Sequence, residues 1–311
     1  MESMKITVVL CTYNRHRSLT KALESIAQST LPDYVQWEVL VVDNNSNDPT
    51  RSLIESFCQK YPGRFRYLFE SQQGKSHALN AGVAQALGGI LVFTDDDVRV
   101  EPTWLYNLTA ALHNGEWAGV GGRTLPERAF EFPRWLRLDE RYALAPLALF
   151  DRDSDSCELN EAPFGNNMAY RKVMFEKHGN FRIDLGPSPE RPGPQKSEDS
   201  EFGCRLLAAG ERLKYEPSAV IYHAVEENRV RQSYFLSWWF DKQRADIRAF
   251  GTPPNVKWFV EGIPLYLFRR IAVWTLRWIM SVNRARRFSN KCKVWGLAGE
   301  IVECYQQARR E

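Results

Sequence analysis

The sequence has few cysteines and no arrangement of them that could form a structural site. None of the six belongs to a C-x-x-C pair, and they are scattered along 311 residues at Cys11, Cys58, Cys157, Cys204, Cys292 and Cys304. This scatter excludes a zinc knuckle and a disulfide framework, and it indicates a reducing compartment. Residues 1–5 lead directly into a strand-like run, which leaves no room for a signal peptide. We therefore expect a cytoplasmic protein.

Long hydrophobic runs are also missing. The most apolar segment, residues 262–287, is divided by Arg269, Arg270 and Arg277 into pieces of about six residues. About twenty consecutive apolar residues are needed to cross a membrane. The chain has no internal repeat, and its 44% hydrophobic and 25% charged residues are typical of a globular protein. Its length accommodates one α/β domain with an appendage.

The net charge of +3 conceals two parts of opposite sign. Residues 1–228 carry 25 Lys and Arg against 32 Asp and Glu, whereas residues 229–311 carry 16 against 6. Six of the ten tryptophans lie in the second part. We therefore expect a folded acidic domain followed by a basic, aromatic and helical C-terminal region.

Strand-like and helix-like segments alternate in the first half of the chain. Apolar and β-branched runs predict strands at residues 6–11, 37–43, 64–70 and 90–95. Helical spacing and capping signals predict helices at residues 18–29, 75–86 and 102–113 and after Asp48-Pro49. This alternation predicts a mainly parallel sheet with helices on both faces.

The pattern changes in the later part of the domain. Residues 184–197 hold four prolines and two glycines, which predicts a mobile loop. A helix is predicted at residues 197–210, with Ser197 as its N-cap and Gly210 as its terminator. Residues 212–223 then return to extended structure.

Carboxylates follow two of the predicted strands, where ligands bind in parallel sheets. Asp43 ends "WEVLVVD", and Asp95, Asp96 and Asp97 end "ILVFTDDD". Asp95 and Asp97 are two residues apart, so on extended backbone both point to the same side. Such a pair suits a divalent cation that also contacts a substrate's phosphates. An acidic turn or helix start is the alternative.

Six stretches in a fixed order resemble the family 2 glycosyltransferases of the GT-A fold. They are "VVLCTYNR", "VVDNNSND", "GKSHALNAG", "FTDDD", "GNNMAYRKVMFEKHGNF" and "SEDSEFGCRLLAAGERLKYEPSAVIYH". The resemblance covers residues 6–223 and implies a nucleotide-sugar-binding half at 1–122 and an acceptor-binding half at 123–228. It also implies a GT-A catalytic domain at 1–228 and leaves a helical C-terminal region at 229–311.

The resemblance implies how the first strands bind the donor. Thr12 and Tyr13 line the nucleotide pocket, and Arg15 lies close to the phosphates. Asp43 accepts a hydrogen bond from the base, which is uracil in many members. Many relatives carry a second acid after it, but this chain has Asn44, which leaves the base preference open.

The next matching segments imply the phosphate and metal contacts. Lys75 and Asn80 lie beside the nucleotide; a solvated lysine is the alternative for Lys75. The stretch around Lys75 is no P-loop, because residue 69 is Phe where the first glycine would stand. Asp95 and Asp96 contact the donor in this interpretation.

The metal motif D-x-D is matched by residues 95–97. Asp97, with Asp95, would bind Mn²⁺ or Mg²⁺ bridging the diphosphate, and the cation would neutralise the neighbouring carboxylates. In some GT-A enzymes a histidine at a comparable place completes the metal shell, which here is His223. A packed core histidine is the alternative.

The later motifs imply the acceptor side. In "SED", Asp199 is the base that takes the proton from the acceptor hydroxyl, with Glu198 as the fallback. Acids at a helix start are also ordinary capping chemistry. Asn166 and Asn167 match the acceptor-side turn, for which a plain loop is an equal interpretation. The proline-rich segment 184–197 closes over the donor in this hypothesis.

The basic C-terminal region suggests a membrane surface. Arg270, Arg277 and Arg284 recur every seven residues, while Leu267 and Trp274, together with Trp278, occupy other parts of the helix surface. This pattern in residues 262–287 is typical of an in-plane interfacial helix on an anionic leaflet. The alternative is a helical subdomain packed on the catalytic core or on a second copy in a homo-oligomer. No nucleic-acid reader motif is present, so we expect no nucleic-acid partner.

These observations together with the resemblance, which alone implies the inverting stereochemistry, predict a metal-dependent inverting glycosyltransferase. It moves a hexosyl or N-acetylhexosaminyl group from a nucleotide sugar, expected to be a UDP-sugar, to a glycan or lipid-linked glycan acceptor in bacterial exopolysaccharide synthesis. We expect it at the inner face of the cell membrane as a peripheral protein. A sugar nucleotidyltransferase is one alternative, although its Gly-rich loop is replaced here by "CTYNRHRS". A catalytically silent scaffold that retains the fold is the other.

Overall fold

The computed structural model describes two compact units. The residues described are 4–113, 115–128, 131–137, 141–189 and 196–309. The sheet unit comprises Met1–Arg128, Ala148–Glu190 and Glu198–Ala224, and the helical unit comprises Ala129–Leu147, Arg191–Ser197 and Val225–Glu311. Two segments before residue 228 therefore group with the C-terminal helices, and the domain boundary expected at that residue stays a prediction.

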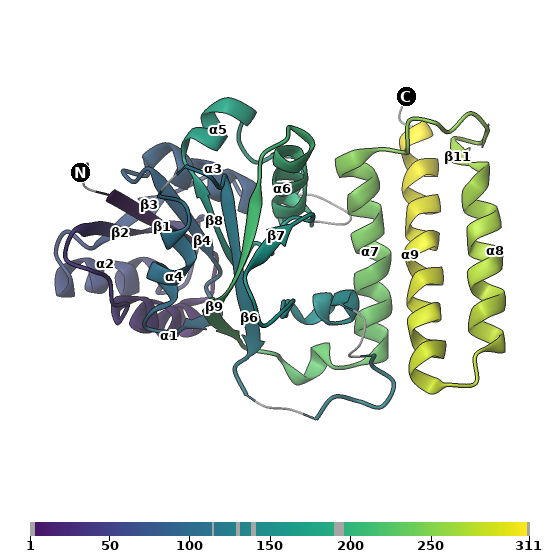
Figure 1. The fold of residues 1–311 in the computed structure, drawn as a ribbon, viewed down its shortest axis with the longest axis horizontal. Coiled ribbons are helices and arrows are strands. Elements are labelled where there is room, and N and C mark those ends of the chain that lie inside the picture. The colour runs from purple at the N-terminus through teal and green to yellow at the C-terminus, as the bar shows by residue number, and fades with distance from the viewer. Residues whose placement is uncertain (1–3, 114, 129–130, 138–140, 190–195, 310–311) are drawn as a thin grey trace. The chain divides into compact units, whose positions relative to one another are not determined.

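The sheet unit is built on one mixed sheet (Figure 1). Among the described residues nine strands form it, eight of them in the order β3-β2-β1-β4-β8-β6-β9-β5, with β7 paired to β9. The strands are β1 Met4–Thr12, β2 Val35–Asp43, β3 Phe65–Phe69, β4 Ile90–Thr94, β5 Val98–Val100, β6 Gly119–Pro126, β7 Cys157–Leu159, β8 Asn167–Arg171 and β9 Leu213–His223. Strands β3, β2, β1 and β4 are parallel, and β8 runs against both of its neighbours. The expected mainly parallel sheet of an α/β fold is confirmed.

Helices cover both faces of this sheet. They are α1 His16–Ala27, α2 Thr50–Lys60, α3 Lys75–Gln85, α4 Trp104–Ala110, α5 Val173–His178 and α6 Glu198–Ala208. Strand β1 shows the division, because Val8 packs with α1 and α2 residues on one face and Val9 with α3 residues on the other. The alternation of side chains along a strand produces these two cores. The parallel crossovers bring the ends of β1, β2 and β4 to one edge of the sheet.

The described residues of the helical unit form three long helices. They are α7 Gln232–Phe250, α8 Leu265–Met280 and α9 Arg284–Ala308, with short strands β10 Phe259–Val260 and β11 Ile263–Pro264 and 3₁₀ turns η1 Arg141–Leu147 and η2 Glu227–Arg229. Helix α9 packs against both α7 and α8 (Figure 1). The buried Glu303 on α9 accepts hydrogen bonds from Arg244 and Arg248 on α7. Trp135 packs edge-to-face on Phe235 of α7 and Phe288 of α9.

Two details of the expected interfacial helix are wrong. Residues 262–287 are not one helix, because α8 ends at Met280 and the side chain of Asn283 caps α9 by accepting a hydrogen bond from the amide of Arg286. Arg284 therefore lies on a different helix from Arg270 and Arg277, so the three do not form one stripe. The inner face of α8 carries Leu267 and the two tryptophans, which pack toward α9. Among the described residues, no helix is long and apolar enough to cross a membrane.

Candidate active site

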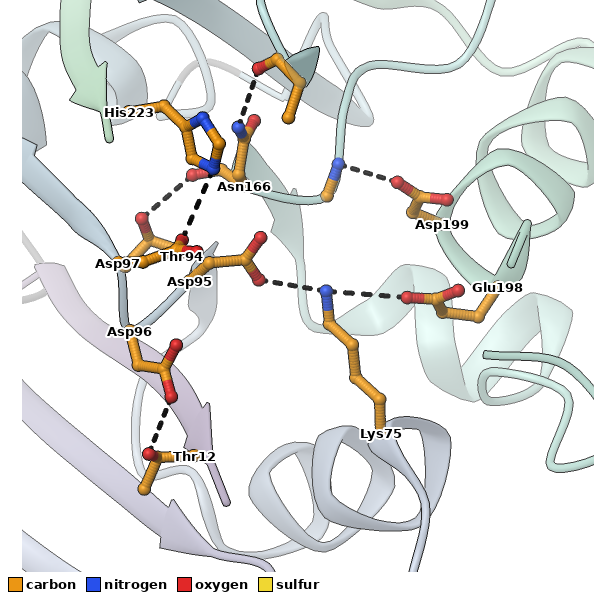
Figure 2. Close-up of polar contacts among 12 residues, drawn as sticks. Thr12, Lys75, Thr94, Asp95, Asp96, Asp97, Asn166, Glu198, Asp199 and His223 are labelled. Atoms are coloured by element: carbon orange, nitrogen blue, oxygen red, sulfur yellow. Dashed lines mark hydrogen bonds and ion pairs between the residues drawn. The ribbon is translucent and has the colours of Figure 1, made fainter. Parts of the chain in front are cut away.

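Polar side chains gather where β1, β2 and β4 end. Thr12 and Asp43 are the last residues of β1 and β2, and Asp95 follows β4 directly. All three positions lie at one edge because the strands are parallel and in register. Arg15 and Lys75 come from the loop before α1 and from the first turn of α3, and α6 contributes Glu198 and Asp199 (Figure 2).

Asp96 is the buried member of the three consecutive aspartates. The Thr12 hydroxyl donates a hydrogen bond of 2.7 Å to one carboxylate oxygen, and Arg15 Nη1 lies 3.2 Å from the other. Burial raises the pKa of Asp96 to about 6, although Arg15 and Thr12 act in the opposite direction. The predicted contacts of Thr12 and Arg15 with a donor stay predictions, and their present partners hold the turn that carries Asp95 and Asp97.

Lys75 joins two carboxylates from different elements. Its Nζ lies 2.9 Å from Asp95 Oδ1 and 3.5 Å from Glu198 Oε1, between the two side chains (Figure 2). Burial raises the pKa of Glu198 to about 7, while Lys75 acts in the opposite direction. Burial alone would lower the pKa of Lys75, but the carboxylates of Asp95, Glu198 and Asp199 raise it well above its usual value. Lys75 is therefore a fixed positive charge inside an acidic cluster.

Asp97 faces a histidine and an arginine. Its Oδ2 lies 2.9 Å from Arg15 Nη1, and its Oδ1 lies 3.6 Å from His223 Nε2. Burial would raise the pKa of Asp97, but His223 and Arg15 outweigh it and hold the pKa well below its usual value. The carboxylate is thus ionised and able to bind a cation.

The residues predicted to hold a metal are close but do not converge. Asp95 turns toward Lys75 while Asp97 turns toward His223 (Figure 2), and no group of three His, Cys, Asp or Glu in the described part of the chain is arranged for a metal. His223 is nevertheless buried, and its Nδ1 has no hydrogen-bond partner among the residues that the structure describes. Mg²⁺ typically takes one or two carboxylates and completes its shell with substrate phosphates and water. The donor set therefore fits a cation that arrives with a diphosphate.

Asp43 and Asn44 differ sharply in what their side chains do. Asp43 accepts hydrogen bonds from the Ser46 amide and the Tyr67 hydroxyl, which fix its carboxylate at the end of β2. Asn44 donates to the carbonyls of Glu70 and Gln72 and accepts from the amide of Gly74. Its amide therefore ties β2 to the loop before α3, which gives a structural reason for an amide at the position where the resemblance implies a second acid.

Asp199 is held by two backbone amides. Gly165 N–H donates to Oδ2 at 2.8 Å and Ser200 N–H donates to Oδ1 at 2.7 Å. A Cβ at Gly165 would lie 2.8 Å from Asp199 Oδ2, so a side chain at this position would push the carboxylate out of its present place. Both bonds leave lone pairs free to accept a further proton donor. Asp199 thus has the fixed orientation that a general base needs.

Ser197 was predicted to cap α6 through its side chain. It precedes α6, but its side chain does not cap the helix. Its hydroxyl donates to Asp246 and accepts a hydrogen bond from Lys242, both on α7 within the helical unit. Its φ of 76° is left-handed rather than the extended conformation of an N-cap. The predicted loop at 184–197 lies partly outside the described residues, which omit 190–195. Its closure over the donor stays a prediction.

Three predicted asparagines are already occupied by hydrogen bonds within the protein. Asn80 exchanges two hydrogen bonds with the backbone of Phe181. Asn166 donates to the carbonyl of Ala148, and Asn167 donates to the carbonyls of Arg123 and Ala219. Their roles toward donor and acceptor stay predictions, and these bonds favour a structural role. Tyr13, by contrast, is exposed beside the site.

Two residues at the site were missed from the sequence. Tyr67 reaches Asp43 from the neighbouring strand, and Gly165 provides the amide that holds Asp199. Nothing in the sequence pairs Tyr67 with Asp43, because the contact depends on the register of β2 and β3. Gly165 directly precedes the predicted Asn166 and Asn167. A glycine at a turn indicates a place where the backbone can approach another group closely, and this was the sequence signal that could have identified it.

Comparison with known proteins identifies the family. The model of "Glycosyl transferase family 2" matches residues 7–179, more than half of the chain. The chain therefore belongs to glycosyl transferase family 2. This assignment disfavours the sugar nucleotidyltransferase alternative.

Individual relatives are distant. The succinoglycan biosynthesis protein ExoM of Rhizobium meliloti is 26% identical over 237 residues, which cover 76% of this chain and 71% of ExoM. The mannosyltransferase PcManGT of Pyrobaculum calidifontis, solved with GDP-Man and Mn²⁺, is 21% identical with a TM-score of 0.56, over 98% of this chain and 75% of that one. S. aureus TarS 1–349, solved with UDP, is 15% identical with a TM-score of 0.51, over 99% and 92%. The two structures show that the fold is shared.

Proposed function

We propose that this protein transfers a sugar from a nucleotide-sugar donor to a hydroxyl group of a glycan, with a divalent cation at the donor site. The observation that carries the proposal is the charge at the sheet edge. Four carboxylates, those of Asp95, Asp96, Asp97 and Glu198, share two cationic side chains, Arg15 and Lys75. A site with excess negative charge favours a divalent cation, and the cation in turn favours a diphosphate.

The residues present suggest how the reaction proceeds. Asp199 accepts the proton of the acceptor hydroxyl while the oxygen of that hydroxyl forms a bond to the anomeric carbon. The bond from that carbon to the diphosphate oxygen breaks, and its electron pair leaves with the nucleoside diphosphate. Asp97, with His223 beside it, would hold Mn²⁺ or Mg²⁺, which when bound stabilises the departing diphosphate. Attack opposite the leaving group inverts the anomeric centre, as the resemblance implies.

The donor is proposed to be a UDP-sugar. Support comes from Asp43, whose fixed carboxylate suits the N–H of a uracil ring, and from the UDP complex of TarS. PcManGT was solved with GDP-Man, and guanine also offers N–H donors, so the nucleotide needs a direct test. The transferred group is proposed to be a hexosyl or N-acetylhexosaminyl group.

The acceptor is proposed to be a growing glycan carried on a lipid at the inner face of the membrane. ExoM takes part, by its name, in the biosynthesis of a polysaccharide, and the basic aromatic segment 262–287 suits an anionic lipid surface. A second copy of the chain remains the alternative partner for that segment.

Calorimetric titration with UDP, GDP, CDP and dTDP tests the proposal. Each nucleotide is added with Mn²⁺ and with EDTA to the wild type and to Asp97→Ala. We expect metal-dependent binding of one nucleotide and its loss in Asp97→Ala. If no nucleotide binds under any condition, the transferase proposal fails and the silent scaffold takes its place. Slow release of nucleoside diphosphate from the matching sugar nucleotide separates an active enzyme from a binding protein.

A further inference from the structure

Helix α8 carries an apolar stripe on its exposed side. Leu265, Phe268, Ala272, Leu276 and Ile279 follow one another at steps of three or four residues, and all are exposed. This spacing places them on one face of the helix. Leu276 and Ile279 keep 58% and 63% of their surface exposed. The stripe is therefore a continuous apolar surface rather than a few scattered side chains.

The stripe continues into the turn between α8 and α9. Met280 is 70% exposed and Val282 is 97% exposed at the tip of this helical hairpin. The opposite face of α8 is already packed, since Leu267 is fully buried with residues of α9 and Trp278 stacks edge-to-face on Trp295. The outer stripe is thus not needed to hold the hairpin together.

The segment that contains this stripe is rich in Lys and Arg and has no acidic residue. Residues 262–299 contain eight Lys and Arg and no Asp or Glu. Cations lie over aromatic rings along the hairpin, with Arg277 and Lys293 on Trp274 and Lys291 on Trp278. Apolar side chains, tryptophans and cations on one hairpin are the combination found at the headgroup level of anionic membranes.

We propose that the exposed face of α8 and the tip of the α8–α9 hairpin bind an anionic lipid bilayer in the plane of its surface. Helix α8 has 16 residues and is about 24 Å long, too short to cross the hydrocarbon core. The stripe enters the apolar boundary while Arg277, Arg284 and Arg286 contact lipid phosphates. This inference rests on the proposed function, because a lipid-linked acceptor would lie in the same surface.

Charge decides between a bilayer and a second copy of the chain. A two-fold interface through this face would place the same patch against itself. Of the eight cations, Arg270 has an acidic partner in Glu300 on α9, and the other seven, which have none among the described residues, would then meet their own copies, which is unfavourable. An anionic bilayer presents the opposite charge and an apolar layer beneath it. Charge complementarity therefore favours lipid.

Vesicle sedimentation with the full chain tests the inference. Vesicles of phosphatidylcholine alone are compared with vesicles containing about a third phosphatidylglycerol. We expect binding to the anionic vesicles, at least tenfold weaker binding for Leu276→Gln/Ile279→Gln, and about fivefold weaker binding for each charge removed at Arg284 or Arg286. Leu87→Gln is the matched control, since Leu87 is 57% exposed in the sheet unit, and it should bind as the wild type does.

The outcomes separate this inference from the proposed function. Failure of the wild type to bind anionic vesicles, or equal binding by the stripe variant, overturns it. A dimer seen by light scattering that dissociates in the stripe variant would instead make this face an interface between copies, which also overturns it. Nucleotide titration of the same variants monitors the donor site, so loss of vesicle binding with intact nucleotide binding isolates the α8 face.

Discussion

The sheet has acidic side chains buried at both of its ends, and the two ends are neutralised differently. At the amino end, Glu38 is 3% exposed and its carboxylate accepts hydrogen bonds from the Thr7 hydroxyl, the Leu87 amide and Arg66. One carboxylate has one cation and two neutral donors there. At the carboxyl end, four carboxylates share Arg15 and Lys75.

This difference indicates how a structural acid is distinguished from a binding site. A buried carboxylate whose partners are all supplied by the protein stabilises the fold and has no need of a ligand. A cluster with fewer cations than carboxylates remains electrostatically incomplete until a ligand brings positive charge. Burial is common to both ends, so it is the balance of charge that marks the site.

The largest expected effect is on catalysis at the carboxyl end. Asp199→Asn should lower kcat by about 10² to 10⁴, because the base is lost while the amide keeps the shape of the carboxylate. The KM for the donor should change by less than about threefold. Steady-state kinetics measure both. Glu201→Gln removes another acid from the same turn of α6 and should leave kcat nearly unchanged. If Asp199→Asn keeps its rate and Glu198→Gln loses it, Glu198 is the base.

The next effect is on stability at the amino end. Glu38→Ala should lower the free energy of unfolding by about 3 kcal/mol, because Thr7, Leu87 and Arg66 lose their acceptor. Urea unfolding measures it. The control is Glu55→Ala, which removes an exposed ion pair with Arg51 of the same 2.8 Å length and should cost less than about 1 kcal/mol. Equal losses in the two variants would contradict the role of burial.

A smaller effect is expected from metal binding at the carboxyl end. In the presence of a saturating nucleoside diphosphate, Mn²⁺ at about a hundred times its Kd should raise the free energy of unfolding by about 2.7 kcal/mol. The gain should vanish in Asp97→Ala and persist in Glu38→Gln, since only one of these carboxylates faces the site. Thermal unfolding with and without EDTA measures it. A gain that survives in Asp97→Ala would place the cation elsewhere.

The smallest effect is a pH dependence of opposite sign at the two ends. The hydrogen bonds of Glu38 lower its pKa despite burial, so its contribution is present above its usual pKa near 4.5 and is lost as the pH falls below it. Burial raises the pKa of Glu198 to about 7, so its ionisation costs stability as the pH rises from about 4.5 through 7. Unfolding from pH 3 to 8 in EDTA should show that Glu38→Gln loses the slope below about pH 4.5 and that Glu198→Gln loses the slope between about pH 4.5 and 7. Parallel profiles would refute the assignment.

Strands β1 to β4 and β9 were predictable from the sequence, whereas β6 and β8 were not. Strands β1 to β4 are runs of Val, Ile, Leu and Phe between turn signals, and the predicted ranges overlap each of them. Strand β6 begins "GVGG" and β8 reads "NMAYR", with little of the β-branched content that marks a strand. Both owe their conformation to neighbours on each side, a tertiary effect that local propensity does not contain.

The site was predictable as a set of residues but not as a set of contacts. Spacing placed Asp95 and Asp97 on one side of an extended chain, whereas the structure turns one toward Lys75 and the other toward His223. The asparagines were predicted by their motifs, yet their hydrogen bonds lie within the fold. Sequence patterns identify which side chains approach a site, but the competition for hydrogen bonds that orients them is decided in three dimensions.

Ser197, the residue before α6, combines a poor backbone position with a good side-chain position. A left-handed φ of 76° costs a serine about 1–2 kcal/mol that glycine would not incur. Glycine, however, has no hydroxyl for Asp246 and Lys242. Alanine would keep the strain and lose the hydrogen bonds, which makes it the worse of the two replacements. The usual expectation that alanine is the neutral substitution is therefore reversed at this position, and Ser197→Ala measures the hydroxyl's hydrogen bonds directly, because serine and alanine share the same backbone strain.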